Sequence, residues 1–550
     1  MTRKAKNILF IMFDQLRYDY LSCTGHPHLH TPNIDALAAR GVRFNRFYVQ
    51  SPICGGSRMC YYTGRYCHSH GAHVNGFPLK VGEMTLGDHL RPLGMSVNLV
   101  GKTHMRTDVE GMERIGLAPE TMIGARVKEC GFDAYERDDG LYPEGHEAKF
   151  PGIGQTMYDQ YLRRHGYESA NPWHDFANSG RTEDDDLASG WFLKHCAEPA
   201  AIAEEHSETP YMTMRGMEFI EQAGDEPWLL HLSYIKPHWP YIVPAPYHNM
   251  YGPEHVIPVK RSAEELQNPH PVYDAFVKDR IGKAFSRDDV RETVIPAYMG
   301  LIKQCDDQMG RLFKWLEDTG RMDDTMIVLT SDHGDYLGDH WLGEKELFHD
   351  ASVKAPLIIY DPSPEADATR GTVCDELTES IDLAPTFVEI AGGVPRSNIL
   401  EGRSLMPFIR GENPKEWREY AISEYDYSPL SYGEKLEVEP KDARLFMVVD
   451  KRWKFIHAIG FRPQLFDLEN DPDEFKDVGG DPACSEIIKT MYDRLFEWAT
   501  RNHARTTVSD DDITANRNNT EARGVLIGVY DEHDLPPEFS KYYTGKPRPA

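Results

Sequence analysis

Short apolar runs that alternate with helical patterns constrain the fold of this chain more than any other feature. Their length, their β-branched residues and their polar flanks predict strands that are buried on both faces. Strands separated in this way by helices predict a mainly parallel, doubly wound α/β sheet. The predicted strands are Ile8–Phe13, Val97–Val100, Trp228–Tyr234, Met326–Thr330 and Leu357–Tyr360.

Start and stop signals in the sequence mark the ends of three predicted helices. The first, 33–40, lies between a Thr-Pro pair and a glycine. The second, 295–316, has Pro296 near its expected start and Gly320 behind it. The third, 381–391, ends at two consecutive glycines.

The composition and the periodicity of the sequence change along the chain and predict three parts. We expect a catalytic α/β domain at 1–410, with a weakly periodic insertion at 106–190 that lies near the pocket. We expect a smaller α+β domain at 411–505, because short strands at 446–449, 454–457 and 464–467 precede a helix at 485–500. Residues 506–550 lack periodicity and are predicted to form a tail that contacts the body or another subunit.

Charge and cysteine usage limit the partners and the compartment. The 550 residues carry a formal charge of −28, so nucleic acid and anionic membrane surfaces are unfavourable partners. An anionic substrate would need a local cationic site. The nine cysteines are irregularly spaced, which favours reduced thiols. No apolar run is long enough for a signal peptide or a membrane span, and we predict a cytoplasmic protein.

Two pairs of candidate metal ligands follow predicted strands directly. Asp14-Gln15 ends the first strand, and Asp332-His333 follows the strand at 326–330. Sites in open α/β sheets form beyond the carboxyl ends of strands, where both members of a pair can face one ion. Oxygen ligands suit Ca²⁺ or Mg²⁺, and one imidazole shifts the preference toward Mn²⁺ or Zn²⁺. The alternative is that Asp14 caps a turn and His333 packs in a loop.

A cysteine precedes a predicted helix at 57–62. Cys54 lies before two glycines, and Arg58 follows. A thiol at the positive end of a helix dipole, beside an arginine, favours an anion there. A buried structural cysteine is the alternative. The nearby run Cys67-His68-Ser69-His70-x-x-His73 fits no standard zinc spacing, and we expect it to form a solvated turn.

The segment around Cys54 resembles the signature of type I sulfatases of the alkaline phosphatase superfamily. That signature reads Cys-x-Pro-Ser-Arg, followed by Thr-Gly-Arg, and this chain has Gly56 where the family has proline. Further motifs of the family occur in order between residue 7 and about residue 480. They include Thr31-Pro32-Asn33-Ile34-Asp35, Gly101-Lys102-Thr103-His104, Lys236-Pro237-His238-Trp239-Pro240, Ser331-Asp332-His333-Gly334 with Lys345, and Leu465-Phe466-Asp467-Leu468.

Two branches of the family are represented in these motifs. The metal set of Asp-Gln and Asp-His resembles the phosphonate monoester hydrolase and phosphodiesterase branch. Lys102 and His104 look instead like sulfatase residues. The resemblance implies an alkaline-phosphatase-like fold, with a large mixed, mostly parallel sheet flanked by helices and a smaller C-terminal α+β domain.

The resemblance also implies the chemistry. A formylglycine-generating maturation enzyme would oxidise Cys54 to formylglycine, whose hydrated aldehyde is the nucleophile and can also contact the metal. Arg58, Lys102 and Lys345 would supply positive charge. His238 would protonate the leaving group, and His104 would deprotonate the second hydroxyl of the hydrated aldehyde. Asn75 would contact the oxyanion; the alternative is that its Asn-Gly pair only forms a turn. Lys102, His238 and Lys345 would bind substrate as well.

The predicted function is metal-dependent hydrolysis of sulfate monoesters, arylsulfatase-like, extending to phosphonate monoesters and phosphodiesters. The expected cofactors are formylglycine and one divalent ion, Mn²⁺ or Ca²⁺, with Zn²⁺ as the alternative. One rival is a dedicated phosphonate monoester hydrolase or phosphodiesterase. The other is a non-catalytic anion-binding relative with an unmodified Cys54. By analogy with related hydrolases, the tail predicts a homo-oligomer, either a dimer or a tetramer.

Overall fold

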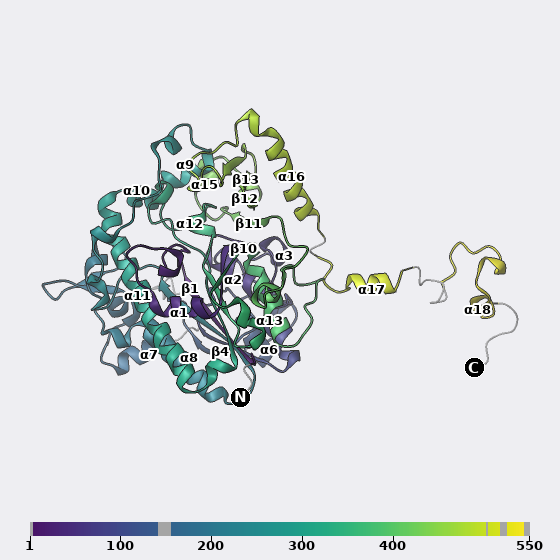
Figure 1. Cartoon of the computed structure of the whole chain (residues 1–550), viewed down its shortest axis with the longest axis horizontal. Helices are drawn as coiled ribbons and strands as arrows, with labels where there is room; N and C mark the ends of the chain where they lie inside the picture. Colours follow the sequence, from purple (N-terminus) through teal and green to yellow (C-terminus); the bar gives the residue numbers. More distant parts are fainter. Residues whose placement is uncertain (1–3, 141–155, 502–503, 518–524, 544–550) are drawn as a thin grey trace. The chain divides into compact units, whose positions relative to one another are not determined.

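The predicted strands pair into one large sheet (Figure 1). The computed structural model describes residues 4–140, 156–501, 504–517 and 525–543. Within them the sheet has eight strands in the order β10-β2-β9-β8-β1-β7-β3-β4. These strands are β1 (Asn7–Asp14), β2 (Val42–Tyr48), β3 (Ser96–Gly101), β4 (Asp133–Arg137), β7 (Trp228–Pro237), β8 (Thr325–Ser331), β9 (Leu357–Tyr360) and β10 (Thr372–Glu379).

The centre of the sheet is parallel, as predicted. Strand β1 pairs in parallel with β7 on one side and with β8 on the other, and β3 follows β7. Every residue of β1, β7 and β8 is buried, which explains their continuous apolar runs. Strand β9 makes the sheet mixed, because it runs antiparallel to both β8 and β2. The edge strand β4 lies inside the segment 106–190 and pairs with β3.

Side chains of β1 alternate between two hydrophobic cores, one on each face of the sheet. Ile8, Phe10 and Met12 belong to the core that contains residues of α2 (Cys54–Thr63) and α13 (Leu383–Ile390). Leu9, Ile11 and Phe13 belong to the core of the opposite face. That second core contains residues of α1 (Pro32–Arg40), α8 (Glu208–Ala223) and α11 (Asp288–Asp318).

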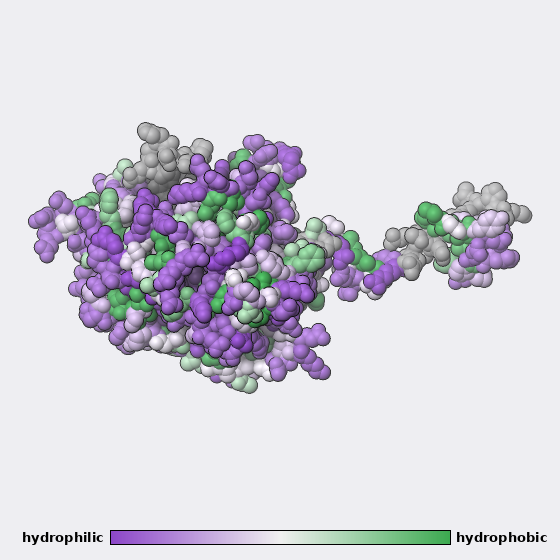
Figure 2. Space-filling view, turned by 90° about the horizontal axis from the view of Figure 1, so that it is seen from above, coloured by the Kyte–Doolittle hydropathy of each residue, from purple (hydrophilic) through white to green (hydrophobic). Residues whose placement is uncertain are grey.

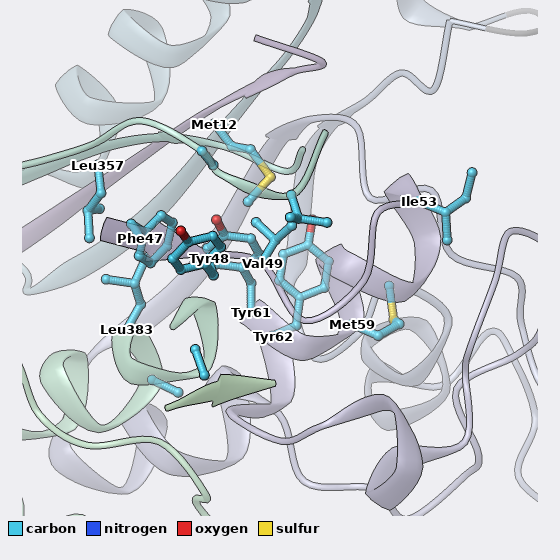
Figure 3. Close-up of a cluster of buried hydrophobic side chains, with 14 of the residues drawn as sticks. Met12, Phe47, Tyr48, Val49, Ile53, Met59, Tyr61, Tyr62, Leu357 and Leu383 are labelled. Carbon is cyan, nitrogen blue, oxygen red and sulfur yellow. The ribbon is translucent and has the colours of Figure 1, made fainter. Parts of the chain in front are cut away.

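Helix α2 is held by the first core. Figure 3 shows Met59, Tyr61 and Tyr62 of this helix among side chains of β1, β2, β9 and α13. All ten residues of α2 are buried. Cys54, in the first turn, is therefore carried by an element with little freedom to move.

Two predicted helix boundaries require comment. Helix α1 matches its prediction to within one residue. Helix α11 begins seven residues before the predicted 295, so Pro296 lies inside the helix and not near its start. The buried face of α11, which packs along the sheet, explains why the helix tolerates this proline, since tertiary packing outweighs local propensity.

The predicted C-terminal strands form a second, antiparallel sheet. Its order is β11 (Ala421–Asp426), β12 (Arg444–Val449), β13 (Trp453–Ala458) and β14 (Gln464–Asp467). Helix α16 (Ser485–Thr500) has the predicted bounds and buries Met491, Leu495 and Trp498 in a core shared with this sheet.

By its contacts the chain divides into two compact units. The first comprises residues 1–395 and 400–501, and the second comprises 396–399 and 502–550. On the face of the molecule in Figure 2, hydrophilic side chains predominate and hydrophobic ones form small, scattered groups. Among the helices of the described residues, none is both long enough and apolar enough to cross a bilayer.

The described residues form further α-helices, most of them short. They are α3 (Cys67–His70), α4 (Leu86–Leu90), α5 (Val109–Arg114), α6 (Met122–Lys128), α7 (Met157–Arg164), α9 (Pro271–Val277), α10 (Arg280–Phe285), α12 (Asp350–Val353), α14 (Met406–Ile409), α15 (Tyr432–Lys435), α17 (Asp510–Ala515) and α18 (Pro537–Ser540).

Candidate functional site

Four neighbouring parallel strands, β8, β1, β7 and β3, end at one edge of the sheet, and the candidate residues lie there. Asp14 is the last residue of β1, and Asp332 directly follows β8. Lys102 follows β3, and His238 follows β7. All four side chains are buried, so their charges interact in a poorly solvated environment.

A possible metal site forms around Cys54. One ligand atom from each of Asp14, Cys54, Asp332 and His333 lies within 4.8 Å of the others. Cys54 Sγ is 3.1 Å from His333 Nε2 and 3.7 Å from Asp14 Oδ1. His333 Nδ1 lies 2.9 Å from the carbonyl oxygen of Gly334 and donates to it, which leaves the Nε2 lone pair facing the cluster. This tautomer suits a metal ligand.

Gln15, which the sequence also predicts as a ligand, has a strained backbone. Its φ of 66° lies in the left-handed region, and its N–H donates to Asp332 Oδ1 at 3.0 Å. The side-chain amide is held from both ends. Lys345 Nζ donates to Oε1 at 2.9 Å, and Nε2 donates to Asp335 Oδ2 at 2.5 Å.

The sequence analysis did not identify Asp335 as a site residue. It is buried, and burial together with the nearby Glu344 raises its pKa to about 6. Tyr241 also donates to Asp335 Oδ2, at 2.6 Å. The available signal was its position, two residues after His333 in the same motif.

Arg58 contacts both carboxylates of the metal set. Its Nη2 is 3.1 Å from Asp14 Oδ2, and its Nε is 2.9 Å from Asp332 Oδ2. Its Nη1 donates to Ser233 Oγ at 2.7 Å and to the Lys102 carbonyl at 3.0 Å. Since these contacts occupy the guanidinium, Arg58 holds the carboxylates of Asp14 and Asp332 in place.

Lys102 and Lys345 place two further cations in the site. Lys102 Nζ is 2.6 Å from Asp14 Oδ2. Burial opposes ionisation of Asp14, but Lys102, His238 and Arg58 outweigh it and hold the pKa of this carboxyl well below its usual value. Burial likewise opposes the charge of Lys345, whose pKa is nevertheless raised, mainly by Cys54, Glu344 and Asp14.

His238 stands beside Lys345. Its Nε2 is 3.3 Å from Lys345 Nζ, and its Nδ1 lies 2.7 Å from the carbonyl oxygen of Trp239 and donates to it. Burial lowers the pKa of His238 well below 6.5, and it outweighs the nearby Asp14 carboxylate, which raises this pKa. The unprotonated Nε2 therefore faces the buried cations.

His104 and Asn75 are more exposed than the buried set. His104 is half-buried, has a φ of 54° and donates its N–H to Asp139 Oδ1 at 3.1 Å. Asn75 is exposed, and its Oδ1 accepts the N–H of Gly55 at 2.7 Å. Asn75 thus contacts the residue after Cys54.

Gly56 has a structural reason for replacing the family's proline. A Cβ at this position would overlap the carbonyl oxygen of His73 and lie 2.7 Å from Ser51 Oγ. The backbone of 73 therefore occupies the space that any larger residue at 56 would need. Helix α2 also begins three residues before the predicted 57, which puts Cys54 itself in the first turn.

The expectation of a solvated turn at 67–73 is wrong for Cys67 and His70, which are buried beside Cys60. Cys60 Sγ is 3.4 Å from Cys67 Sγ and 3.3 Å from His70 Nε2. His70 Nδ1 accepts the N–H of Ala72 at 3.1 Å, so Nε2 carries the proton and donates to sulfur. A metal ligand at Nε2 would need the opposite tautomer, and the cluster is a core contact.

The chain is similar to known proteins over most of its length. The sulfatase family model matches residues 6–123 and 134–394, and the model of the N-sulphoglucosamine sulphohydrolase C-terminal region matches 338–501. A multifunctional alkaline phosphatase superfamily protein of Trinickia caryophylli is 31% identical, covering 92% of this chain and 97% of its own. An arylsulfatase of Clostridium perfringens is 28% identical, covering 88% and 92%.

Two solved structures share both the fold and part of the sequence. The phosphonate monoester hydrolase from Silicibacter pomeroyi has a TM-score of 0.78 and 28% identity, covering 91% of this chain and 96% of its own. The phosphonate monoester hydrolase of Agrobacterium radiobacter has a TM-score of 0.76 and 27% identity, covering 92% and 97%.

Proposed function

The chain belongs to the sulfatase family of the alkaline phosphatase superfamily, and from this premise we propose a metal-dependent hydrolase of sulfate monoesters that also accepts phosphonate monoesters and phosphodiesters. The observation that supports this most directly is the position of Cys54. Its sulfur lies within the ligand cluster, at the N-terminus of the rigid helix α2, with Lys102 and Lys345 as neighbouring cations.

The residues of the site divide the work between charge and proton transfer. A divalent ion at Asp14-Gln15 and Asp332-His333 would polarise the ester and favour ionisation of the nucleophile. Position 54, as formylglycine, supplies that nucleophile. Lys102 and Lys345 stabilise negative charge on the ester oxygens, in a site where burial strengthens the attraction.

Two histidines handle protons in this proposal. His238 Nε2 is the ring atom that can exchange a proton with the departing oxygen, because Nδ1 is bonded to the Trp239 carbonyl. His104, at the edge of the site, takes the proton of the second hydroxyl at position 54. Arg58 keeps Asp14 and Asp332 in place through its two ion pairs.

The metal in this proposal is Mn²⁺ or Ca²⁺, with Zn²⁺ as the alternative. Three oxygen donors with one imidazole suit a hard or borderline ion. Elemental analysis of the purified protein, with Asp332→Asn as the metal-poor control, tests this assignment. Equal metal content in the two proteins would contradict a metal site that includes Asp332.

Maturation of Cys54 is tested by mass. Conversion of cysteine to formylglycine by the maturation enzyme lowers the mass of the peptide by about 18 Da, and protein from a host with that enzyme should show the shift. A thiol that persists with a matched maturase would favour the rival reading, an anion-binding protein without turnover.

The breadth of substrates is tested by rates. We expect measurable kcat/KM for an aryl sulfate, a phenyl phosphonate monoester and an aryl phosphodiester, since all three carry one negative charge near the reacting atom. Turnover of the phosphonate and the phosphodiester without the sulfate would identify a dedicated phosphonate monoester hydrolase.

The compartment and assembly are also proposals. The nine cysteines, all of them among the described residues, form no disulfide, which supports a cytoplasmic location. Residues 506–550 are proposed to join subunits into a dimer or tetramer. Gel filtration of a chain that ends at 505 tests the second point, and an unchanged assembly would count against the tail.

A further inference from the structure

Two tryptophans connect the buried cations of the site with the protein surface. Trp239 directly follows His238, and the centroids of their rings are 4.2 Å apart. Lys345 Nζ lies 5.8 Å from the centroid of the Trp239 indole. On its other side, Trp239 is 5.3 Å from Trp191, which is 46% exposed.

The loop that carries Trp191 is packed closely against the loop that carries Trp239. Gly190 donates its N–H to the Asn178 carbonyl at 3.1 Å. A Cβ at Gly190 would lie 2.5 Å from Ile242 Cγ1 and 3.0 Å from Pro240 Cβ, so only glycine permits this approach.

A buried lysine ties the same two loops together. Lys236 Nζ donates to Asn178 Oδ1 at 2.7 Å and to the Pro240 carbonyl at 2.9 Å. Lys236 is buried, and Asn178 is fully buried. The two indoles are therefore held in position by packing and hydrogen bonds and belong to a built surface.

We propose that Trp239 and Trp191 form the leaving-group subsite, and that this subsite selects esters of planar aromatic alcohols. The inference rests on the proposed function and specifies its substrate class. An ester oxygen that departs beside His238 and Lys345 has Trp239 as its next neighbour, so the group attached to that oxygen extends along the indoles. Planar rings stack on such faces.

The charge of Lys345 is compatible with the same class. The oxygen of an aromatic alcohol gains negative charge as its ester bond breaks, and the Lys345 ammonium, 5.8 Å from the Trp239 ring centroid, can attract that charge before His238 transfers a proton to the oxygen. A sugar would instead need hydrogen-bonding groups around its hydroxyls. Among the described residues, the rings of the two indoles contact each other, the His238 ring and the Lys345 cation.

The kinetic test compares two sulfate esters in matured enzyme. One carries a phenol, and the other carries a fluorinated alkyl alcohol of the same pKa, so that only the ring differs. We expect Trp191→Ala to lower kcat/KM about three- to tenfold for the aryl ester, mainly through KM, and less than twofold for the alkyl ester. Trp191→Phe should restore most of the loss, and Phe192→Ala, at a 62% exposed neighbour, is the matched control.

A hexose sulfate is the third substrate. Equal losses on the aryl and alkyl esters, no loss on either, or a larger loss on the hexose ester would overturn the inference. Wild-type enzyme with matured Cys54 that hydrolyses none of the three esters would refute the proposed function, which is a different result.

A binding measurement keeps the inference testable without turnover. In the Cys54→Ala protein, benzenesulfonate should bind more tightly than methanesulfonate by calorimetry. Adding Trp191→Ala should remove about three- to tenfold of that preference. A preference that is absent, or that survives the loss of Trp191, would overturn the subsite even if the enzyme were inactive.

Discussion

Replacement of Arg58 by methionine separates its electrostatic role from that of the metal. The guanidinium is fully buried and makes four hydrogen bonds. Two of them go to the carboxylates of Asp14 and Asp332, at 3.1 Å and 2.9 Å. Methionine keeps most of the volume and removes the charge.

The expected loss depends on whether a cation occupies the ligand cluster. Without metal, the variant leaves Asp332 without its arginine partner, and removal of one member of a buried ion pair costs about 3–5 kcal/mol. With metal, the ion supplies the missing positive charge. The loss should then fall to that of the two hydrogen bonds to neutral acceptors, about 1–3 kcal/mol.

Urea unfolding followed by tryptophan fluorescence measures both values, once with a chelator and once with saturating Mn²⁺. Arg40→Met is the matched control, because Arg40 forms a surface ion pair with Glu317 at 2.5 Å and should lose less than about 1 kcal/mol in both conditions. An equal loss for Arg58→Met with and without metal would refute the idea that arginine and ion compensate the same carboxylates.

Three further predictions concern single positions. Burial lowers the pKa of His231 to about 3, so the native state binds fewer protons than the unfolded chain between pH 3 and 6.5, and stability is lost as the pH falls through this window. The loss of unfolding free energy caused by His231→Gln, measured by urea unfolding, should therefore be about 2 kcal/mol smaller at pH 5 than at pH 7. An equal loss at the two pH values would contradict this prediction. Asp335→Leu frees the Gln15 amide and should raise the metal Kd about 10- to 100-fold by calorimetry, whereas an unchanged Kd would show that Asp335 does not position it. Gly56→Pro should lower the free energy of unfolding by about 1–3 kcal/mol, because the proline ring would overlap the His73 carbonyl. A variant as stable as the wild type in urea unfolding would argue against that overlap.

The central strands, and the places of the residue pairs that follow β1 and β8, could be read from the sequence because both signals are local. A parallel strand that is buried on both faces has a nearly unbroken run of apolar residues, as in β1, β7 and β8. Strand β2 was missed because Arg43, Asn45 and Arg46 interrupt its apolar residues, and it therefore lacks the unbroken apolar run by which the central strands were predicted.

The role of Arg58 illustrates what local pattern leaves open. Its place in the motif indicated a cation near the substrate, and the structure adds two ion pairs with residues 44 and 274 positions away. The burial of Cys67 and His70 beside Cys60 has the same origin, because a turn and a core contact can share one sequence spacing.

The sequence by itself determined the α/β class, the elements that end at the site, and the family motifs, since these depend on periodicity and on residues next to strand ends. Only the tertiary structure decided the antiparallel direction of β9, the clasp of Asp335 on Gln15, the space that excludes a side chain at Gly56, and the pairing of Trp239 with Trp191. Each of these depends on which distant segments pack together. That choice is set by the burial of the whole core and by the spatial match of its parts, and it leaves no periodic signal in the chain.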